Sequence, residues 1–374
     1  MKKTFFGCGS LDKVATIVNG LGAKKILLIS GKESFALTGA QERIRQLFDG
    51  VTVTIFNSFR TNPRLEDVER GVYLLRENSF DLIVSIGGGS VIDMAKLVNI
   101  LSIQEGGKIS DFVTGRRPIR KPGLPLIAIP TTSGSGSQAT HFAVVYIESA
   151  KYSLSHNYML PEYAIIDPSL SYSSPNHLAA SNIMDALAHA IESFWSIGST
   201  KKSRKYSIRS IKLILPTLKK FPVKDSMSQS ALALAAHLSG RAINTSKTTA
   251  AHALSYPISM YFGIQHGHAV ALVLGKLFLI NSSSDSEILD SRGREYVNSI
   301  MRQLFLALNV NSAKEAEILW NELLRGVGLS YNLAEIGITS RRDIAKIVEN
   351  VNLERLNNNP VRINKKMLYS ILIN

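Results

Sequence analysis

Four side chains in the second half of the chain have the types and spacing of a metal site. Asp185 and His189 are four residues apart, so on a helix both side chains would lie on one face, one turn apart. His252 and His266 are fourteen residues apart. One carboxylate and three imidazoles suit a divalent cation of borderline hardness, Zn²⁺ or Fe²⁺. An Asp-x-x-x-His pair is more often a surface pair or a helix cap, so residue types alone do not assemble these four.

Two loops rich in small residues have the chemistry of a dinucleotide site. Gly87-Gly88-Gly89-Ser90 lies between a predicted strand and a predicted helix, where glycines let a phosphate approach the backbone and the helix N-terminus offers free N–H groups. Asp93 lies one turn further and either binds the nucleotide or stabilises the helix N-terminus. The second loop, Pro130–Ser137, follows another predicted strand and supplies several hydroxyls. The first loop does not match GxGxxG and alone is also compatible with a ligand-free turn, but the two loops together favour a nucleotide crevice.

The elements that must position these residues divide the chain in two. In the first half, short apolar runs alternate with helical patterns, which is typical of βαβ units around a parallel sheet. The predicted strands are Lys25–Ser30, Val51–Asn57, Asp81–Ile86 and Leu124–Pro130, and the predicted helices are Leu65–Asn78 and Val91–Ser102.

After about Ser174 the pattern is helical throughout, and no convincing strand is found. The predicted helices are Leu178–Ser196, Lys205–Phe221, Ser228–Ala242, Ala269–Ile280, Ser299–Leu308, Ala313–Gly326 and Ser340–Val348. A Ser/Pro-rich stretch, Asp167–Pro175, marks the boundary. We therefore expect an α/β dinucleotide-binding domain with a parallel sheet over residues 1–174, and an all-α metal- and substrate-binding domain over residues 175–374. The cleft between two such domains is a natural place for a site.

Composition limits the class of protein further. With 374 residues, 45% of them hydrophobic and 19% charged, the chain can bury a large core. The single cysteine, Cys8, cannot form an internal disulfide or a thiolate metal cage, and fits a reducing cytoplasm. No transmembrane run and no signal peptide are predicted. The net charge of +14 is compatible with nucleic acid, a membrane surface or an anionic small substrate.

Four motifs, taken together and in order, resemble the iron-containing (group III) alcohol dehydrogenase family over almost the whole chain. They are SIGGGSVIDMAK, AIPTTSGSGSQAT, NIMDALAHAIES and AAHALSYPISMYFGIQHG. The resemblance implies that family's two-domain fold, which is related to that of dehydroquinate synthase, and an NAD(P)H-dependent oxidoreductase acting on alcohols and aldehydes. It implies that Asp185, His189, His252 and His266 hold one Fe²⁺ or Zn²⁺. The cofactor-binding residues that it implies are Gly87, Gly88, Gly89, Ser90, Asp93, Thr131, Thr132, Ser135, Lys151 and Leu178.

Two departures from the family pattern concern the substrate. Many members carry a further histidine four residues after the third ligand, where this chain has Tyr256, and HGxANA is replaced by HGHAVA from His266. The stretch around His252 and His266 resembles the phosphonoacetaldehyde reductase branch of the family. We therefore expect reduction of phosphonoacetaldehyde to 2-hydroxyethylphosphonate, with Lys247 and His268 as substrate-binding residues. A general short-chain alcohol dehydrogenase or aldehyde reductase of the same family is the alternative.

The end of the first predicted strand bears on the choice of cofactor. Many relatives that prefer NAD place an acidic residue there, which holds the ribose 2′-hydroxyl and repels a 2′-phosphate. Here Gly31 stands at that position, followed by Lys32, and Ser34 is also near. Without the carboxylate the repulsion is absent, so the sequence predicts that NADPH is used at least as well as NADH.

Two basic runs raise an alternative of another class, a nucleic-acid-binding protein. Lys201–Lys212 has six basic residues in twelve, and Arg116–Lys121 has four in six. The first run lies on a predicted amphipathic helix, where a solvated face is the commoner explanation, and no zinc-finger or RNA-recognition signature is found. We expect no nucleic-acid or membrane partner, a cytoplasmic location and a homo-oligomer, namely a dimer.

Overall fold

The computed structural model describes residues 3–32, 34–148 and 150–373. The chain forms two compact units, residues 1–174 and residues 175–374. No helix in the described ranges combines the length and apolar character that crossing a membrane requires.

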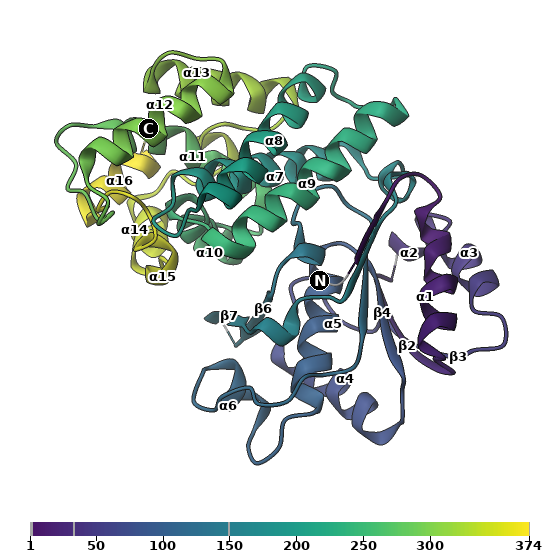
Figure 1. Ribbon diagram of the computed structural model, residues 1–374. Coiled ribbons are helices and arrows are strands. Elements are labelled where there is room, and N and C mark those ends of the chain that lie inside the picture. The colour runs from purple at the N-terminus through teal and green to yellow at the C-terminus, as the bar shows by residue number, and fades with distance from the viewer. Residues whose placement is uncertain (1–2, 33, 149, 374) are drawn as a thin grey trace. The chain divides into compact units, whose positions relative to one another are not determined.

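The first unit is built on a parallel sheet of six strands in the order β1-β8-β5-β4-β2-β3 (Figure 1). A separate antiparallel pair is formed by β6 and β7. The strands are β1 (Lys3–Phe6), β2 (Lys25–Ser30), β3 (Thr52–Phe56), β4 (Leu82–Gly87), β5 (Leu126–Pro130), β6 (Phe142–Ile147), β7 (Ala150–Ser155) and β8 (Tyr163–Ile166).

Helices cover both faces of this sheet, which explains why its strands are continuous apolar runs rather than alternating ones. All six residues of β4 are buried. The helices of this unit are α1 (Lys13–Leu21), α2 (Ser34–Leu37), α3 (Ala40–Leu47), α4 (Leu65–Glu77), α5 (Gly89–Ser102) and α6 (Ile109–Val113). Side chains of β2 alternate between two apolar clusters: Ile26 and Leu28 pack with α1 and α3, whereas Leu27 and Ile29 pack with α4 and α5.

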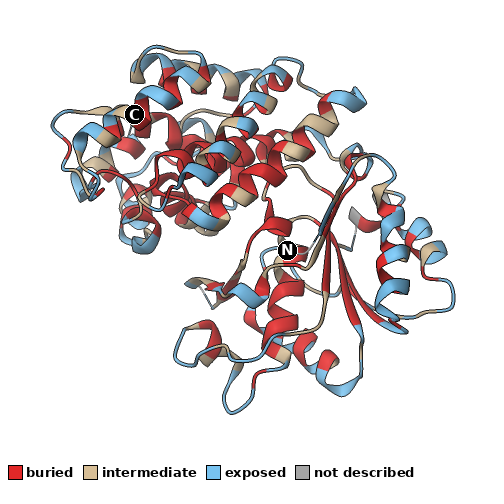
Figure 2. Ribbon diagram, in the orientation of Figure 1, coloured by how far each residue is buried: buried red, intermediate tan, exposed pale blue. Residues whose placement is uncertain are grey.

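The second unit is helical. Its helices are α7 (Asn176–Trp195), α8 (Lys201–Leu218), α9 (Ser226–Ser246), α10 (Ala250–Phe262), α11 (His266–Ser282), α12 (Arg294–Leu308), α13 (Ala313–Gly326), α14 (Arg341–Glu349), α15 (Leu353–Leu356) and α16 (Lys365–Ile373). Figure 2 shows that most of α7 and α11 is buried. These two helices are apolar on nearly all sides, which is typical of the centre of a helical bundle. Short 3₁₀ helices complete the fold at Ser10–Asp12, Ser137–Ala139, Asn157–Met159, Pro168–Ser171 and Ala334–Ile336.

The fold class expected from the sequence is confirmed: a parallel sheet lies in the first unit and helices form the second. Among the described residues of the second unit, strand pairing is limited to one isolated bridge, Ile288 with Val361. The prediction was incomplete in the first unit, where β1, β6, β7, β8, α1, α2, α3 and α6 were missed. In the second unit it missed α15, α16 and α10, the helix that carries His252.

Candidate functional site

Three of the four predicted metal ligands meet in the interior of the second unit. Asp185 and His189 lie one turn apart on α7, and His252 comes from the first turn of α10. Oδ1 of Asp185 is 3.8 Å from Nε2 of His189 and 3.5 Å from Nε2 of His252. The two imidazole rings stack with centroids 4.6 Å apart. One ligand atom from each of the three residues lies within 4.8 Å of the other two, so a single cation can contact all three.

Buried atoms in this cluster fit a cation. Asp185 Oδ1, His189 Nδ1 and His252 Nε2 are buried and have no hydrogen-bond partner among the described residues. Buried polar atoms are normally satisfied, because leaving one unpaired costs about 1–3 kcal/mol. A carboxylate with imidazoles is a donor set that suits Zn²⁺ or Fe²⁺.

The fourth predicted ligand, His266, begins α11 beside this cluster. Its ring lies 5.4 Å from that of His252, centroid to centroid, and its Nδ1 is 3.5 Å from Oγ of Ser255. The next residue, Gly267, packs against Ser181 and Asp185 of α7. The glycine thus allows α11 to begin directly against the helix that carries Asp185.

Burial and charge act in opposite directions on the titration of these groups. Burial raises the pKa of Asp185, but His189, His252 and His266 outweigh it and lower that pKa below its ordinary value. Burial lowers the pKa of His189 to about 4, which keeps its imidazole neutral and able to donate a lone pair. Burial also lowers the pKa of His252, but Glu192 and Asp185 outweigh it and raise this pKa to about 8.

Glu192 is a part of this site that the sequence analysis missed. It lies on α7, fully buried, and one carboxylate oxygen is in close contact with Nδ1 of His252. The spacing could have revealed it, because residue 192 lies three after His189 and seven after Asp185, on the same helix face.

The predicted cofactor loops gather at the carboxyl edge of the parallel sheet. Gly31 follows β2, Gly87–Ser90 spans the end of β4 and the start of α5, and Thr131–Ser135 follows β5. The chain runs from β2 outward to β3, then returns to form β4 on the other side of β2. Strand order therefore reverses between β2 and β4, and the crevice at such a reversal is where doubly wound sheets bind nucleotides.

Close packing between two of these loops accounts for the small residues. A Cβ on Gly89 would lie 2.7 Å from Oγ of Ser135, and one on Gly88 would contact Thr132. Gly88 occupies the N-cap position of α5 and has no side chain with which to cap it. The first N–H groups of this helix therefore have no side-chain cap, which is compatible with the predicted phosphate contact. The buried hydroxyl of Thr131 has no hydrogen-bond partner among the residues described.

Asp93 is used within the protein in a way the sequence did not suggest. Its Oδ1 accepts from Oγ of Ser137 at 2.5 Å and its Oδ2 from the backbone N–H of Val144 at 2.9 Å. The buried ammonium of Lys96 donates to Ser137 and Thr140, both at 2.9 Å. Together these bonds tie the second loop to α5. Asp93 therefore holds the loop, and its predicted contact with the nucleotide stays a prediction.

The remaining cofactor candidates belong to other elements of the chain. Lys151 is on β7 with its Nζ 5.8 Å from the centre of the Tyr146 ring, and Leu178 is half-buried in the first turns of α7. Lys32 is exposed. The side chain of Ser34 lies outside the described residues.

Both predicted substrate-binding residues already have partners. Lys247, at the end of α9, pairs with Glu354 at 2.6 Å, and both side chains are about half exposed. His268 is buried, and its Nε2 is 2.9 Å from the backbone oxygen of Ser330. Burial lowers the pKa of His268, which disfavours a cationic imidazole at that position. Their roles toward a substrate stay predictions.

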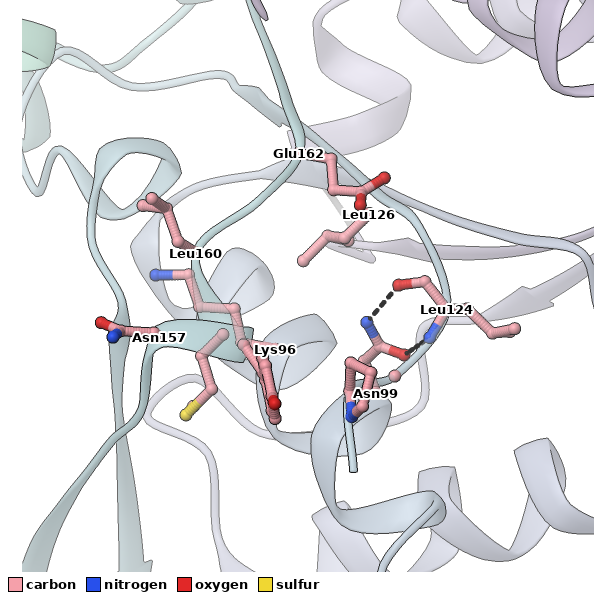
Figure 3. A pocket seen from close by; sticks show the side chains of 11 residues that line it. Lys96, Asn99, Leu124, Leu126, Asn157, Leu160 and Glu162 are labelled. Atoms are coloured by element: carbon pink, nitrogen blue, oxygen red, sulfur yellow. Dashed lines mark hydrogen bonds between the residues drawn. The ribbon is translucent and has the colours of Figure 1, made fainter. Parts of the chain in front are cut away.

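A pocket of about 260 Å³ opens at the other edge of the sheet, before β5 and β8 (Figure 3). Its wall is fixed by Asn99, whose side-chain amide exchanges two hydrogen bonds of 2.8 Å with the backbone of Leu124. Lys96, Tyr158 and Glu162 also line it. Because it lies at the amino ends of these strands, this pocket is not the predicted cofactor crevice.

Comparison with known families decides the classification of the chain. The profile of iron-containing alcohol dehydrogenases matches residues 2–168, and the profile of the C-terminal part of the Fe-containing alcohol dehydrogenase family matches residues 179–374. The chain belongs to the iron-containing alcohol dehydrogenase family. It is therefore an oxidoreductase of a family that uses NAD(P) and a metal.

Individual relatives of this iron-containing alcohol dehydrogenase differ in their named substrates. Long-chain-alcohol dehydrogenase 1 of Geobacillus thermodenitrificans is 35% identical over 72% of this chain and 69% of the relative. Phosphonoacetaldehyde reductase of Streptomyces viridochromogenes is 31% identical over 80% of this chain and 77% of the relative. The crystal structure of sulfoacetaldehyde reductase from Bifidobacterium kashiwanohense in complex with NAD⁺ superposes with a TM-score of 0.86 at 27% identity, covering 99% of this chain and 95% of that one.

Proposed function

We propose that this enzyme reduces a small anionic aldehyde with NAD(P)H, and that its substrate is phosphonoacetaldehyde, which it converts to 2-hydroxyethylphosphonate. The observation that carries the reductase chemistry is the buried cluster of Asp185, His189 and His252, in which Asp185 Oδ1 and His252 Nε2 face each other without a hydrogen-bond partner among the described residues. The anionic substrate is supported by relatives named for phosphonoacetaldehyde and sulfoacetaldehyde, both aldehydes that carry an acidic group.

The residues of each unit have separate tasks in this proposal. Asp185, His189, His252 and His266 would hold one Fe²⁺ or Zn²⁺, and the loops at Gly31, Gly87–Ser90 and Thr131–Ser135 would hold the cofactor. When bound, the cation supplies Lewis acidity toward the aldehyde oxygen, and the reduced nicotinamide supplies the hydride. Asp185 contributes the negative charge that offsets the cation, and the low pKa of His189 keeps its imidazole unprotonated at neutral pH.

A buried positive charge near the cluster supports an anionic substrate. Arg355, on α15, is 4% exposed, and its charge opposes the rise that burial causes in the pKa of Tyr256, the residue that replaces a common family histidine. The Tyr256 ring lies 6.0 Å from that of His266. The pKa of His189 is lowered mainly by burial, and the positive charge of Arg355 lowers it further. The guanidinium is therefore close enough to the predicted ligands to act on their charge. Arg355 is thus better placed to attract a phosphonate than Lys247, which is paired with Glu354.

A general alcohol dehydrogenase is the second candidate. The relative named for long-chain alcohols is more similar to this chain, at 35% identity, than the phosphonoacetaldehyde reductase at 31%. Under this alternative the buried guanidinium of Arg355 would have only a structural role, and uncharged aldehydes would be the better substrates.

An anaerobic assay separates the two candidates. Protein loaded with Fe²⁺ or Zn²⁺ should oxidise NADH or NADPH with phosphonoacetaldehyde at a higher kcat/KM than with acetaldehyde or a long-chain aldehyde. His266→Ala should lose most activity and metal content. Equal or better turnover of the uncharged aldehydes would exclude the phosphonate specificity, and full metal content in His266→Ala would remove that residue from the ligand set.

A further inference from the structure

Glu192 stands out because a fully buried carboxylate is costly unless both oxygens are satisfied. It lies one turn beyond His189 on α7, and its two oxygens serve different groups. Both groups belong to the first turn of α10, the helix that carries His252.

The first oxygen, Oε1, completes the N-terminus of α10. It accepts from Oγ1 of Thr249 at 2.7 Å, from the backbone N–H of Ala251 at 2.8 Å and from that of Thr249 at 3.2 Å. Thr249 is itself the N-cap residue but its side chain makes no capping bond. The Glu192 carboxylate from α7 thus caps the N-terminus of α10 and places negative charge at the positive end of its helix dipole.

The second oxygen, Oε2, accepts from Nδ1 of His252. A carboxylate oxygen can only accept, so Nδ1 carries a proton. When a cation replaces the second proton of the ring, the lone pair that binds it is therefore on Nε2. Nε2 is the buried atom without a protein partner, 3.5 Å from Oδ1 of Asp185. The contact with Glu192 therefore fixes both the tautomer and the direction of the ring.

A further bond fixes the direction of the Thr249 hydroxyl. Nε1 of Trp195 donates to Oγ1 of Thr249 at 2.9 Å, and Trp195 lies one turn beyond Glu192 on α7. Because the indole N–H is only a donor, the Thr249 hydroxyl must direct its own proton to Glu192. Trp195, Thr249 and Glu192 thus form a directed chain of hydrogen bonds within the buried interior of this unit.

We propose that Glu192 is the positioning residue of the metal centre, holding His252 with Nε2 turned toward the cation while anchoring the start of α10 to α7. This inference rests on the proposed metal site. It assigns a role to a residue outside the four ligands, and it predicts that ligand geometry and helix capping depend on one carboxylate.

The test is Glu192→Gln. The amide offers one oxygen where the carboxylate offers two, so either His252 or the N-terminus of α10 must face an NH₂ group. We expect Zn²⁺ to bind about 10- to 100-fold more weakly, the usual effect of losing such an outer partner of a ligand. The measurement is competition with a chromophoric chelator, and the visible absorption of the Co²⁺-loaded protein should change as well.

Thr249→Val is the matched control. It removes a hydrogen bond to the same carboxylate but leaves the contact between Glu192 and His252. It should lower the thermal unfolding midpoint of the metal-free protein. Zn²⁺ affinity should stay within about threefold of wild type, because an outer residue affects affinity by orienting a ligand, and the hydroxyl of Thr249 donates to Glu192 rather than to the His252 ring. Glu192→Asp serves as a second variant if Glu192→Gln does not fold: its shorter side chain cannot reach both groups, so Zn²⁺ should again bind more weakly.

The outcomes separate this inference from the proposed function. Wild-type protein that binds no Zn²⁺ would refute the metal site and this inference together. Wild-type protein that binds Zn²⁺, alongside Glu192 variants of unchanged affinity, would refute only the role of Glu192. Equal loss of affinity in Thr249→Val would reduce Glu192 to a helix cap and also overturn the inference.

Discussion

Replacing Gly267 with alanine should disturb the metal centre without touching a ligand. Gly267 lies between His266 and His268 in the first turn of α11 and packs against α7. A Cβ added there would lie 2.8 Å from Cβ of Asp185 and 2.9 Å from the backbone carbonyl carbon of Ser181, with the oxygen of Ser181 closer still. Carbon atoms in contact are about 3.5–4.0 Å apart, so the carbon contacts alone require α11 and α7 to separate by about 0.7 Å. The closer oxygen of Ser181 requires more than about 1 Å, because a carbon–oxygen contact is about 3.3 Å or longer.

The size of that displacement determines the expected loss of unfolding free energy and of Zn²⁺ affinity. The obstacle is mostly backbone, which cannot rotate away, so overpacking should cost about 1–3 kcal/mol of unfolding free energy. The shift also moves His266 away from Asp185, and misplacement by about 1 Å in a site of this kind costs up to about 100-fold in rate. We therefore expect Gly267→Ala to fold, to unfold at lower denaturant concentration and to bind Zn²⁺ at least about tenfold more weakly.

Gly326→Ala is the matched control for this substitution. Gly326 ends α13, is exposed, and a Cβ there would meet no atom within 4 Å. This change should be neutral or should stabilise the protein by up to about 1 kcal/mol, because alanine restricts the unfolded chain. Denaturant unfolding and metal content after dialysis are to be measured for both variants. Wild-type metal binding by Gly267→Ala would refute the packing argument, as would an equal loss in Gly326→Ala.

Three further predictions concern charge. If Lys247 rather than Arg355 contacts the phosphonate, Lys247→Ala should raise KM for phosphonoacetaldehyde about ten- to a hundred-fold more than KM for acetaldehyde; equal effects would leave Lys247 only its pairing with Glu354 and would favour Arg355. Gly31→Asp should shift kcat/KM toward NADH, and a wild-type preference for NADH of about tenfold or more would contradict our interpretation of Gly31. Burial lowers the pKa of His237 to about 4 from 6.5. Between these values the unfolded chain binds a proton that the folded chain does not, so stability should fall by up to about 3 kcal/mol as pH drops from 6.5 to 4. His237→Gln should remove the share of that dependence that His237 contributes and leave the share of His189, whose pKa is also lowered to about 4; denaturant unfolding at several pH values would show the difference.

The sequence predicted those strands whose burial leaves a periodic or continuous apolar signal. β2 was predicted with its observed bounds, and β4 and β5 within two residues at each end. β1 has no such signal, since three of its four residues are exposed. It is a strand because it pairs with β8, which lies some 160 residues later in the chain. Pairing over that distance cannot be deduced from local periodicity.

The metal ligands likewise include a pair that local spacing predicts and a pair that depends on how helices pack. Asp185 and His189 share one helix, so their spacing alone predicts that they meet. His252 and His266 do not share a helix, because α10 ends at Phe262, followed by Gly263 in a left-handed conformation, and α11 begins at His266. Only the break in the helix between α10 and α11 brings the ring centroids of His252 and His266 to 5.4 Å from each other. The sequence contains the glycine, but its consequence depends on how two helices pack against a third.

Glu192 shows that a signal in the sequence can remain unused. In the predicted helix Leu178–Ser196 it lies among Ala190, Ile191 and Phe194, on a helix too apolar to have a fully solvated side. A carboxylate in such a place must find donors in the interior, because burying it unpaired is prohibitive. Two of the three polar residues on that helix face were already assigned to a cation, and a cation needs its imidazole ligands oriented. The requirement for buried donors and the requirement for an oriented imidazole are met by the same contact, between Glu192 and His252.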